Sequence, residues 1–328
     1  YFEESNDVVS GGKNVSCYMC TSINDKYGVT IEDSIDLQLH SMTIINPINS
    51  PALNVDNSGL SQNGNIILKN ITVDFNSTDF NNYAIKLNDV DADISNLQIN
   101  GNNSGFYWNA KGSIVSYFND SVINTRGTNA CFDLVEHSQL LMNNINFQCD
   151  SAPSLDFSFV NITNSYFSSN SSNSDYFLMK SSSHLRWISS SIMSDPLFES
   201  EDNIVDEMWF IEVHVMNQYF NHIPFSSVNI TFDQYESEYI GVLPYEGIEI
   251  LGPFNGKRWT PLNGWSLSNN VYTGCDYDSV HNDTQSLELI NDIEVTCILE
   301  ISNQPPIIIW ATPSNDEVYA SGSEVIFD

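Results

Sequence analysis

Basic residues are scarce in this sequence. It has 10 Lys and Arg against 42 Asp and Glu in 328 residues, which gives a net charge of −32. Proteins that bind DNA or RNA neutralise phosphates with Lys and Arg, so nucleic acid is excluded as a partner. Anionic membrane surfaces and acidic polysaccharides are disfavoured for the same reason. The charge instead favours cations such as Ca²⁺ and Mg²⁺, and it keeps exposed surfaces soluble by mutual repulsion.

Long apolar runs are missing as well. No stretch reaches the roughly 18 apolar residues that a membrane-spanning helix needs. The longest run, Ile307–Ala311, has the length of a strand. The chain starts at Tyr1 rather than Met. We therefore expect either that a signal peptide has been removed or that the chain is a fragment.

Common catalytic motifs are also absent. The sequence contains no HExxH, GxSxG or GxGxxG, and Gly252–Lys257 is one residue short of a P-loop. The histidines share no metal-ligand spacing, and we expect each of them at a turn or on the surface. They are His40, His137, His184, His214, His222 and His281.

Cysteine is present in an even number, and its six copies fall into three close pairs. This pattern favours disulfides and an oxidising compartment. Zinc is the alternative for Cys17 and Cys20, but no second CxxC or HxxxH supplies the two further ligands. The expected disulfides are Cys17–Cys20, Cys131–Cys149 and Cys275–Cys297.

The most informative feature is an internal repeat. Its template is apolar, any, Asn/Ser/Asp, any, any, apolar. Seven copies follow one another at intervals of 29, 26, 24, 24, 20 and 26 residues. The copies are Leu39–Ile44, Leu68–Val73, Ile94–Ile99, Phe118–Ile123, Met142–Phe147, Ile162–Phe167 and Ile188–Met193.

A second short apolar segment precedes most copies, as in Phe106-Tyr107-Trp108. Each unit is therefore expected to hold two or three strands of three to five residues. Such a unit cannot bury its apolar face alone, so units must stack coil upon coil. A polar residue at the third position of the template can be explained physically. Asn tolerates the left-handed conformation of a tight turn, and stacked Asn side chains can bond one coil to the next.

These repeats resemble the right-handed parallel β-helix proteins, the pectate-lyase-like superfamily, over roughly residues 29–200. The resemblance implies an all-β fold. It leaves activity open, because many members are polysaccharide lyases or hydrolases and many others are non-catalytic surface proteins. The Asn-Thr-Asp, Asp-Asp and Gly-His-Gly motifs of the polygalacturonase type are absent here, and the basic residues of the coils do not cluster in the repeat register.

The repeat ends and the sequence pattern changes near Asp206. Alternating segments at 208–215, 228–232, 247–251, 287–290 and 293–299 are separated by turns at Asn217-Gln218, Leu243-Pro244, Asn255-Gly256 and Asn263-Gly264. They predict a small β-sandwich in which Cys275–Cys297 joins two strands. This part resembles the immunoglobulin-like modules that follow β-helices in archaeal and bacterial surface proteins.

The end of the chain resembles the opening of a PKD-type or related immunoglobulin-like domain. The sequence thus predicts an N-terminal cap (1–28), a parallel β-helix (29–205) and an Ig-like β-sandwich (206–302). Residues 303–328 are then a linker with the first strands of a further module, or a strand exchanged with another molecule.

Candidate ion and sugar sites are few. Alternate acids in two loops offer oxygen ligands for Ca²⁺, the one cofactor considered, although neither loop has the Gly and bidentate Glu of an EF-hand. These acids are Asp89, Asp91 and Asp93, and Asp276, Asp278 and Asp283. Among the aromatic residues, at least one of Phe106, Tyr107 and Trp108 is expected in the core, and Trp259 and Trp265 are expected to pack in the sandwich.

Sequons for N-glycosylation are about as frequent as 41 Asn would give by chance. They permit glycosylation without demonstrating it. They are Asn14, Asn70, Asn76, Asn102, Asn119, Asn161, Asn170, Asn229 and Asn282.

We therefore expect a non-catalytic structural protein, a subunit or fragment of an extracellular or cell-surface glycoprotein assembly such as an S-layer, sheath or filament. Its partners would be copies of itself or further domains of a longer chain. The heavy acidity suits a salty medium, and an archaeal source would fit. Two alternatives stay open: a carbohydrate-binding adhesin, and a β-helix enzyme acting on a neutral polysaccharide.

Overall fold

The computed structural model describes residues 7–10, 15–23, 28–45, 51–58, 66–75, 83–101, 105–112, 114–126, 131–137, 139–169, 177–190, 195–234, 238–283 and 286–301. Every regular element in these ranges is a strand. The predicted all-β class and the parallel β-helix are confirmed. The predicted strands at 303–328 lie outside the described residues.

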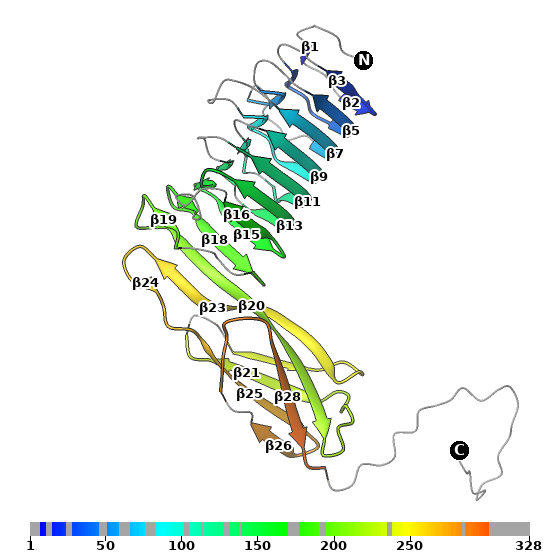
Figure 1. Cartoon of the computed structure of the whole chain (residues 1–328). Coiled ribbons are helices and arrows are strands. Elements are labelled where there is room, and N and C mark those ends of the chain that lie inside the picture. Colours follow the sequence, from blue (N-terminus) through cyan, green and yellow to red (C-terminus); the bar gives the residue numbers. More distant parts are fainter. Residues whose placement is uncertain are drawn as a thin grey trace, which may run out of the picture.

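Two parallel sheets form the first part of the chain, which we call the solenoid (Figure 1). One sheet, which we call the short-strand sheet, contains mostly strands of two to four residues. In spatial order they are β1 (Asp7–Ser10), β4 (Val29–Glu32), β6 (Leu53–Asp56), β8 (Ile85–Asn88), β10 (Phe106–Asn109), β12 (Phe132–Val135), β14 (Ser154–Asp156), β17 (Leu178–Met179) and β19 (Leu197–Phe198).

The second sheet, which we call the long-strand sheet, contains strands of up to 14 residues. In spatial order they are β2 (Val15–Tyr18) with β3 (Thr21–Ile23), β5 (Leu37–Ile45), β7 (Ile66–Phe75), β9 (Ala92–Gly101), β11 (Ser116–Thr125), β13 (Leu140–Cys149), β15 (Phe159–Thr163) with β16 (Tyr166–Ser169), β18 (His184–Ile188), β20 (Ile204–Asn217), β23 (Ile248–Thr260) and β24 (Gly264–Trp265), and β28 (Ile293–Leu299) pairs with β20. Because β1 and β2 already pair with β4 and β5, the parallel ladder begins upstream of the predicted boundary at residue 28.

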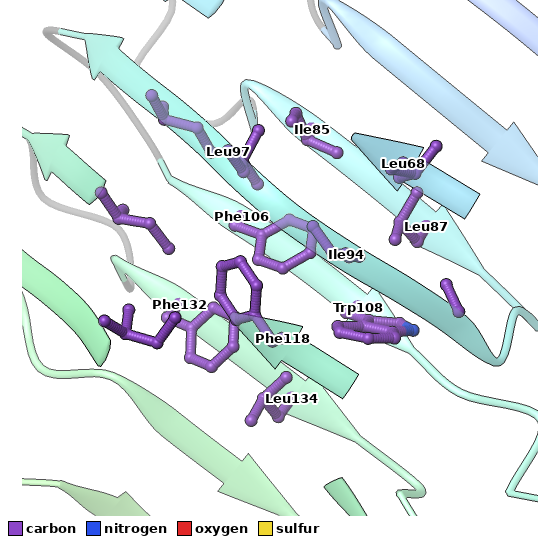
Figure 2. Close-up of a cluster of buried hydrophobic side chains, with 14 of the residues drawn as sticks. Leu68, Ile85, Leu87, Ile94, Leu97, Phe106, Trp108, Phe118, Phe132 and Leu134 are labelled. Atoms are coloured by element: carbon purple, nitrogen blue, oxygen red, sulfur yellow. The ribbon is translucent and has the colours of Figure 1, made fainter. Parts of the chain in front are cut away.

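The solenoid core comes from alternation of buried and outward-facing residues along the strands, most regularly in the four-residue strands β6, β8, β10 and β12. In β10, Phe106 and Trp108 point inward and are fully buried while Tyr107 faces out, as the sequence predicted. Figure 2 shows the centre of this core, where Phe106, Phe118 and Phe132 stack between successive coils. Parallel register places equivalent residues directly above one another, so Phe106 packs on Phe132 of the next coil and Trp108 lies beside Leu134.

A left-handed residue bends each long strand in its middle. The third position of the template has a positive φ in six of the seven copies, as predicted: Ser41, Asn70, Asn96, Asp120, Asn144 and Asn164. The strand continues on both sides of the bend. The segments that the sequence suggested were separate short strands therefore form single elements of nine or ten residues in β5, β7, β9, β11 and β13.

The seventh copy was predicted one residue out of register. The left-handed residue is Ser189 rather than Ser190, and the buried position before it is Trp187. Pairing of Ile162 with Trp187 fixes this register. An eighth copy at Met19 was missed, because its residue is apolar and exposed.

Polar side chains tie the coils together at the bends. Asn96 Nδ2 donates to Asn70 Oδ1 at 2.9 Å, and Asn144 Nδ2 donates to Asp120 Oδ1 at 2.8 Å. Buried hydroxyls do the same for backbone amides, as where Ser121 Oγ accepts from the N–H of Leu97 at 2.9 Å. The polar third position is thus used both for its conformation and for its hydrogen bonds.

The C-terminal module has a core of its own. Its second sheet contains β22 (Tyr239–Val242), β21 (Ser227–Phe232), β25 (Asn270–Tyr277), β26 (Val280–Asp283) and β27 (Leu287–Glu288). Apolar residues of this sheet pack against those of β20, β23 and β28. The Cys275–Cys297 disulfide joins β25 to β28 across this core, and the other two cysteine pairs are also as predicted.

Strand β20 belongs to both parts. Ile204–Met208 pairs in parallel with β18 of the solenoid, and Ile211–Asn217 pairs in parallel with β28 of the module. The predicted boundary at residues 205 and 206 therefore falls inside a strand. One hydrogen-bonded sheet runs through both parts (Figure 1).

The predicted turn at Asn255-Gly256 is wrong. Both residues lie inside β23, where the pairing with β20 shifts by one residue. Gly256 is needed there because a Cβ would lie 2.3 Å from the carbonyl oxygen of Leu289. A glycine within a strand marks a bulge or a close approach more often than a turn when neighbouring strands crowd it.

Candidate functional site

A polar hollow lies on the outward face of the module's second sheet. It has a volume of about 400 Å³. Antiparallel pairing sets Asn229 of β21 beside Gly274 of β25, and Gly274 beside Asp283 of β26. We call this recess the Gly274 hollow. It is lined by Asn229, Thr231, Tyr272, Thr273, Gly274, Asp276, His281 and Asp283.

The missing side chain of Gly274 creates the floor of the hollow. A Cβ at this position would lie 3.0 Å from Asp283 Oδ1 and 3.3 Å from His281 Cε1. Tyr272, two residues earlier on the same face, is 42% exposed and offers a ring at the rim. The charge of Asp233 raises the pKa of the Tyr272 hydroxyl. The ring therefore stays neutral at ordinary pH.

His281 lies between two carboxylates. Its Nδ1 is 2.7 Å from Asp276 Oδ1, and its Nε2 is 2.9 Å from Asp283 Oδ1. Both ring nitrogens can donate only in the imidazolium form. The hydrogen bond with Asp276 and the charges of both acids raise the pKa of His281.

The first predicted calcium loop does not converge on a common point. Asp89 occupies a left-handed bend, and Asp91 is buried and accepts the backbone N–H groups of Gly112 and Ile114 at 2.9 and 3.2 Å. Asp93 lies on β9, and burial raises its pKa. In the described part of the chain, no group of three or more His, Cys, Asp or Glu side chains is placed to hold a metal ion. Calcium binding stays a prediction.

The second predicted loop supplies the hollow instead. Asp276 and Asp283 bracket His281. Asp278 lines a neighbouring recess of about 550 Å³ together with Phe225, Ser227, Asp276 and Tyr277. The histidine between the acids was not anticipated, because only strand pairing brings residues 276, 281 and 283 together.

The described sequons sit in different surroundings. Asn70 and Asn282 are exposed, and Asn119, Asn161 and Asn229 are half-buried. Asn229 lines the hollow, and its Oδ1 is buried without a hydrogen-bond partner in the described structure. The remaining predicted sequons lie outside the described residues: Asn14, Asn76, Asn102 and Asn170.

Acids on the outer face of the short-strand sheet are occupied by neighbours. Asp133 accepts from the hydroxyls of Tyr83, at 2.8 Å, and Ser154. Lys180 Nζ lies 3.5 Å from the same carboxylate. These contacts link several coils, so Asp133 stabilises the stacking of the coils.

The solenoid and module meet at a buried carboxylate. Asp206 is 1% exposed, and Arg258 donates to both of its oxygens, at 2.6 and 2.8 Å. His184 Nε2 lies 2.8 Å from Oδ2. Burial alone would raise the pKa of Asp206, but the two partners lower it from 3.8 to about 2. No sequence pattern signals this cluster, because Arg258 lies 52 residues away from Asp206.

The expectation that every histidine lies at a turn or on the surface is wrong for His137. This side chain is 2% exposed, stacks edge-on against Trp108 and has its Nε2 3.2 Å from the Trp108 carbonyl oxygen. Burial lowers its pKa from 6.5 to about 4. It is a neutral core residue.

Trp259 and Trp265 pack against the solenoid core, although the sequence placed them within the sandwich. They meet edge to face at 5.1 Å, and Trp259 stacks on Phe198 at 6.0 Å. Asp195 accepts from the Trp265 indole N–H at 2.9 Å. The β23–β24 hairpin thereby covers the last coil and its apolar end.

Comparison with known proteins gives no match to a protein-family model, a curated protein or a solved structure. Within the described ranges there is no helix with the length and apolarity to cross a membrane.

Proposed function

We propose that this chain is a non-catalytic structural protein of an extracellular or cell-surface assembly, with the solenoid as a rigid stalk. The observation that carries the proposal is the shared strand β20. A strand that is hydrogen-bonded to both parts leaves no free linker between them. The Asp206–Arg258–His184 cluster fixes side chains across the same junction.

The shape also supports a spacer. Nine strands of the short-strand sheet, spaced by about 4.8 Å, give a solenoid about 40 Å long. Strand β1 lies at one end of the molecule and the C-terminal end of β28 lies at the other (Figure 1). The finer assignments also belong to this proposal: a right-handed coil and an immunoglobulin-like module. The inter-sheet disulfide and the two-sheet core favour the second.

Light scattering and negative-stain microscopy of the purified protein, with Ca²⁺ and with EDTA, test this function. Ordered polymers or lattices that dissolve in EDTA would support surface assembly and calcium binding together. Polymers in both conditions would support assembly without calcium. Dispersed monomers in both, and in native material, would contradict the proposal.

Glycan binding is a second candidate, and the Gly274 hollow favours it. An exposed Tyr ring beside amide and carboxylate groups suits a sugar, which offers an apolar ring face and hydroxyl groups. Gly274→Val would fill the floor, whereas Gly241→Val on the edge strand β22 is a control outside the hollow. A glycan-array signal lost in the first variant and kept in the second would support this candidate. No signal with the unaltered protein would remove it.

A further inference from the structure

Four exposed aromatic side chains gather at the end of the module that lies away from the solenoid. We call them the distal aromatic surface: Tyr219, Phe220, Phe225 and Tyr245, exposed by 74, 70, 62 and 60%. Single exposed apolar side chains are common on protein surfaces, whereas a group of them close together marks an interaction site.

Two loops carry this surface, and hydrogen bonds join them. The N–H of Leu243 donates to the carbonyl of Ser226 at 2.9 Å, and the N–H of Phe225 donates to that of Pro244 at 3.4 Å. The Phe225 and Tyr245 rings touch at a centroid distance of 6.0 Å. The rings therefore project from a fixed base.

The backbone of this surface is held in an unfavourable conformation. Phe220 and Phe225 have φ values of 63° and 56°, a region that bulky side chains rarely occupy. Asn217 holds the first turn, because its Oδ1 accepts the N–H groups of Tyr219 and Asn221 at 2.9 and 3.0 Å. Strain of this kind persists where surrounding structure enforces it and is common at binding sites.

The chain leaves the module beside these rings. The Gln218 side chain makes two hydrogen bonds to the backbone of Ile301. Its Nε2 donates to the Ile301 carbonyl at 3.0 Å, and its Oε1 accepts from the Ile301 N–H at 3.1 Å. Five residues, 302–306, then precede the apolar run Ile307–Trp310. Five residues span at most about 18 Å, so the run begins within reach of the surface.

We propose that Ile307–Trp310 of the same chain covers the distal aromatic surface and so fixes the direction in which the protein continues. A short tether gives the run an effective concentration in the millimolar range. A second copy is the weaker candidate at low protein concentration, because it has no such tether. This contact deepens the proposed stalk function, but its test does not depend on assembly.

Hydroxyl-radical footprinting of the full chain tests the contact. Ile308→Asp with Trp310→Asp should release the run and raise oxidation of Phe220, Phe225 and Tyr245 about threefold, since reactivity follows exposed area. Ser314→Asp with Ser321→Asp adds the same charge nearby and should change nothing. Tyr166 on the solenoid, 58% exposed, is the internal reference.

Removing the rings gives the reciprocal test. Phe220→Asn with Phe225→Asn keeps the left-handed turns, which Asn tolerates, and takes away the apolar contact. Chymotrypsin should then cleave after Trp310 several times faster than in the unaltered chain.

The proposal would be overturned if Ile308→Asp with Trp310→Asp left the oxidation of the three rings as it is in the unaltered chain. It would also be overturned if Phe220→Asn with Phe225→Asn left the rate of cleavage after Trp310 unchanged. Ring protection that disappears on dilution of the unaltered chain would overturn it in favour of a second copy. Assembly, measured separately by light scattering, reports on the proposed function and not on this contact.

Discussion

The solenoid and the C-terminal module bury their apolar residues in different ways. In the solenoid each coil repeats the one before it, and equivalent residues such as Phe106 and Phe132 stack in register. In the module the core joins strands far apart in sequence, and the Cys275–Cys297 disulfide crosses it. A repeated pattern therefore lets each coil stack on the next through equivalent residues, whereas the module depends on specific contacts between strands that are distant in the sequence.

The largest expected effect is in the solenoid core. Phe132→Ala removes a ring that packs on Phe106, Phe118 and Phe147. It should lower the free energy of unfolding by about 4 kcal/mol. Chemical denaturation followed by far-UV circular dichroism measures this loss. A loss below about 1 kcal/mol would mean that the coils repack freely, against the register described here.

The next largest effect is expected from removing one disulfide in each part. Cys275–Cys297 and Cys131–Cys149 close loops of similar length, with sequence separations of 22 and 18. Chain entropy therefore gives each about 3 kcal/mol. We expect paired Cys→Ser changes to cost more in the module, because its two sheets lose a link across the core. Calorimetry that showed the greater loss for Cys131→Ser with Cys149→Ser would contradict this.

The junction should respond more weakly than either core. Arg258→Ala leaves Asp206 buried with His184 as its remaining partner. We expect a loss of about 2 kcal/mol, since hydrogen bonds to charged groups contribute about 1.5–3 kcal/mol. The solenoid and module should then unfold in two separate transitions. Lys257→Ala, the neighbouring basic residue on β23, is the control and should keep one transition. A single transition in both variants would mean that the cluster does not couple the parts.

Acid should have the same effect on the junction. The pKa of Asp206 falls from 3.8 to about 2 on folding. The lowered value means that its ionised form stabilises the folded state above pH 4, and that this contribution is lost as the pH falls from about 4 to about 2. Asp206→Asn should flatten this part of the stability curve. An unaltered curve in that variant would exclude Asp206 as its source.

The smallest effect belongs to the bends. Asn144→Ala places a less tolerant residue at a φ of 56° and removes the hydrogen bond to Asp120. We expect a loss of about 1 kcal/mol, and a smaller one for Asn144→Gly, which adopts this conformation freely. Thermal unfolding of the two variants compares them. Equal losses would assign the effect to the hydrogen bond alone.

The sequence predicted the solenoid because its constraints are local. A polar residue such as Asn96 or Asn144 recurs at each bend, and alternation marks the strands around it. The prediction failed where a coil departs from the pattern: Met19 is apolar, and the last copy carries serine at both 189 and 190.

The module was harder to predict because its contacts are distant. Strands β22 and β26 were not anticipated, and β25 was expected only as a strand that carries Cys275 and without its bounds, since Gly, Asp and Thr interrupt their alternation. The Gly274 hollow exists only once β21, β25 and β26 are side by side. Likewise, nothing near Asp206 in the sequence signals Arg258 as its partner. Such sites follow from tertiary pairing and leave little local trace.

Small-angle X-ray scattering of the purified chain tests whether β20 makes the solenoid and the module one rigid body. We expect the data at low and at high salt to fit a single orientation of the module relative to the solenoid. Scattering that requires a range of angles between two bodies hinged near residues 204–208 would contradict the account.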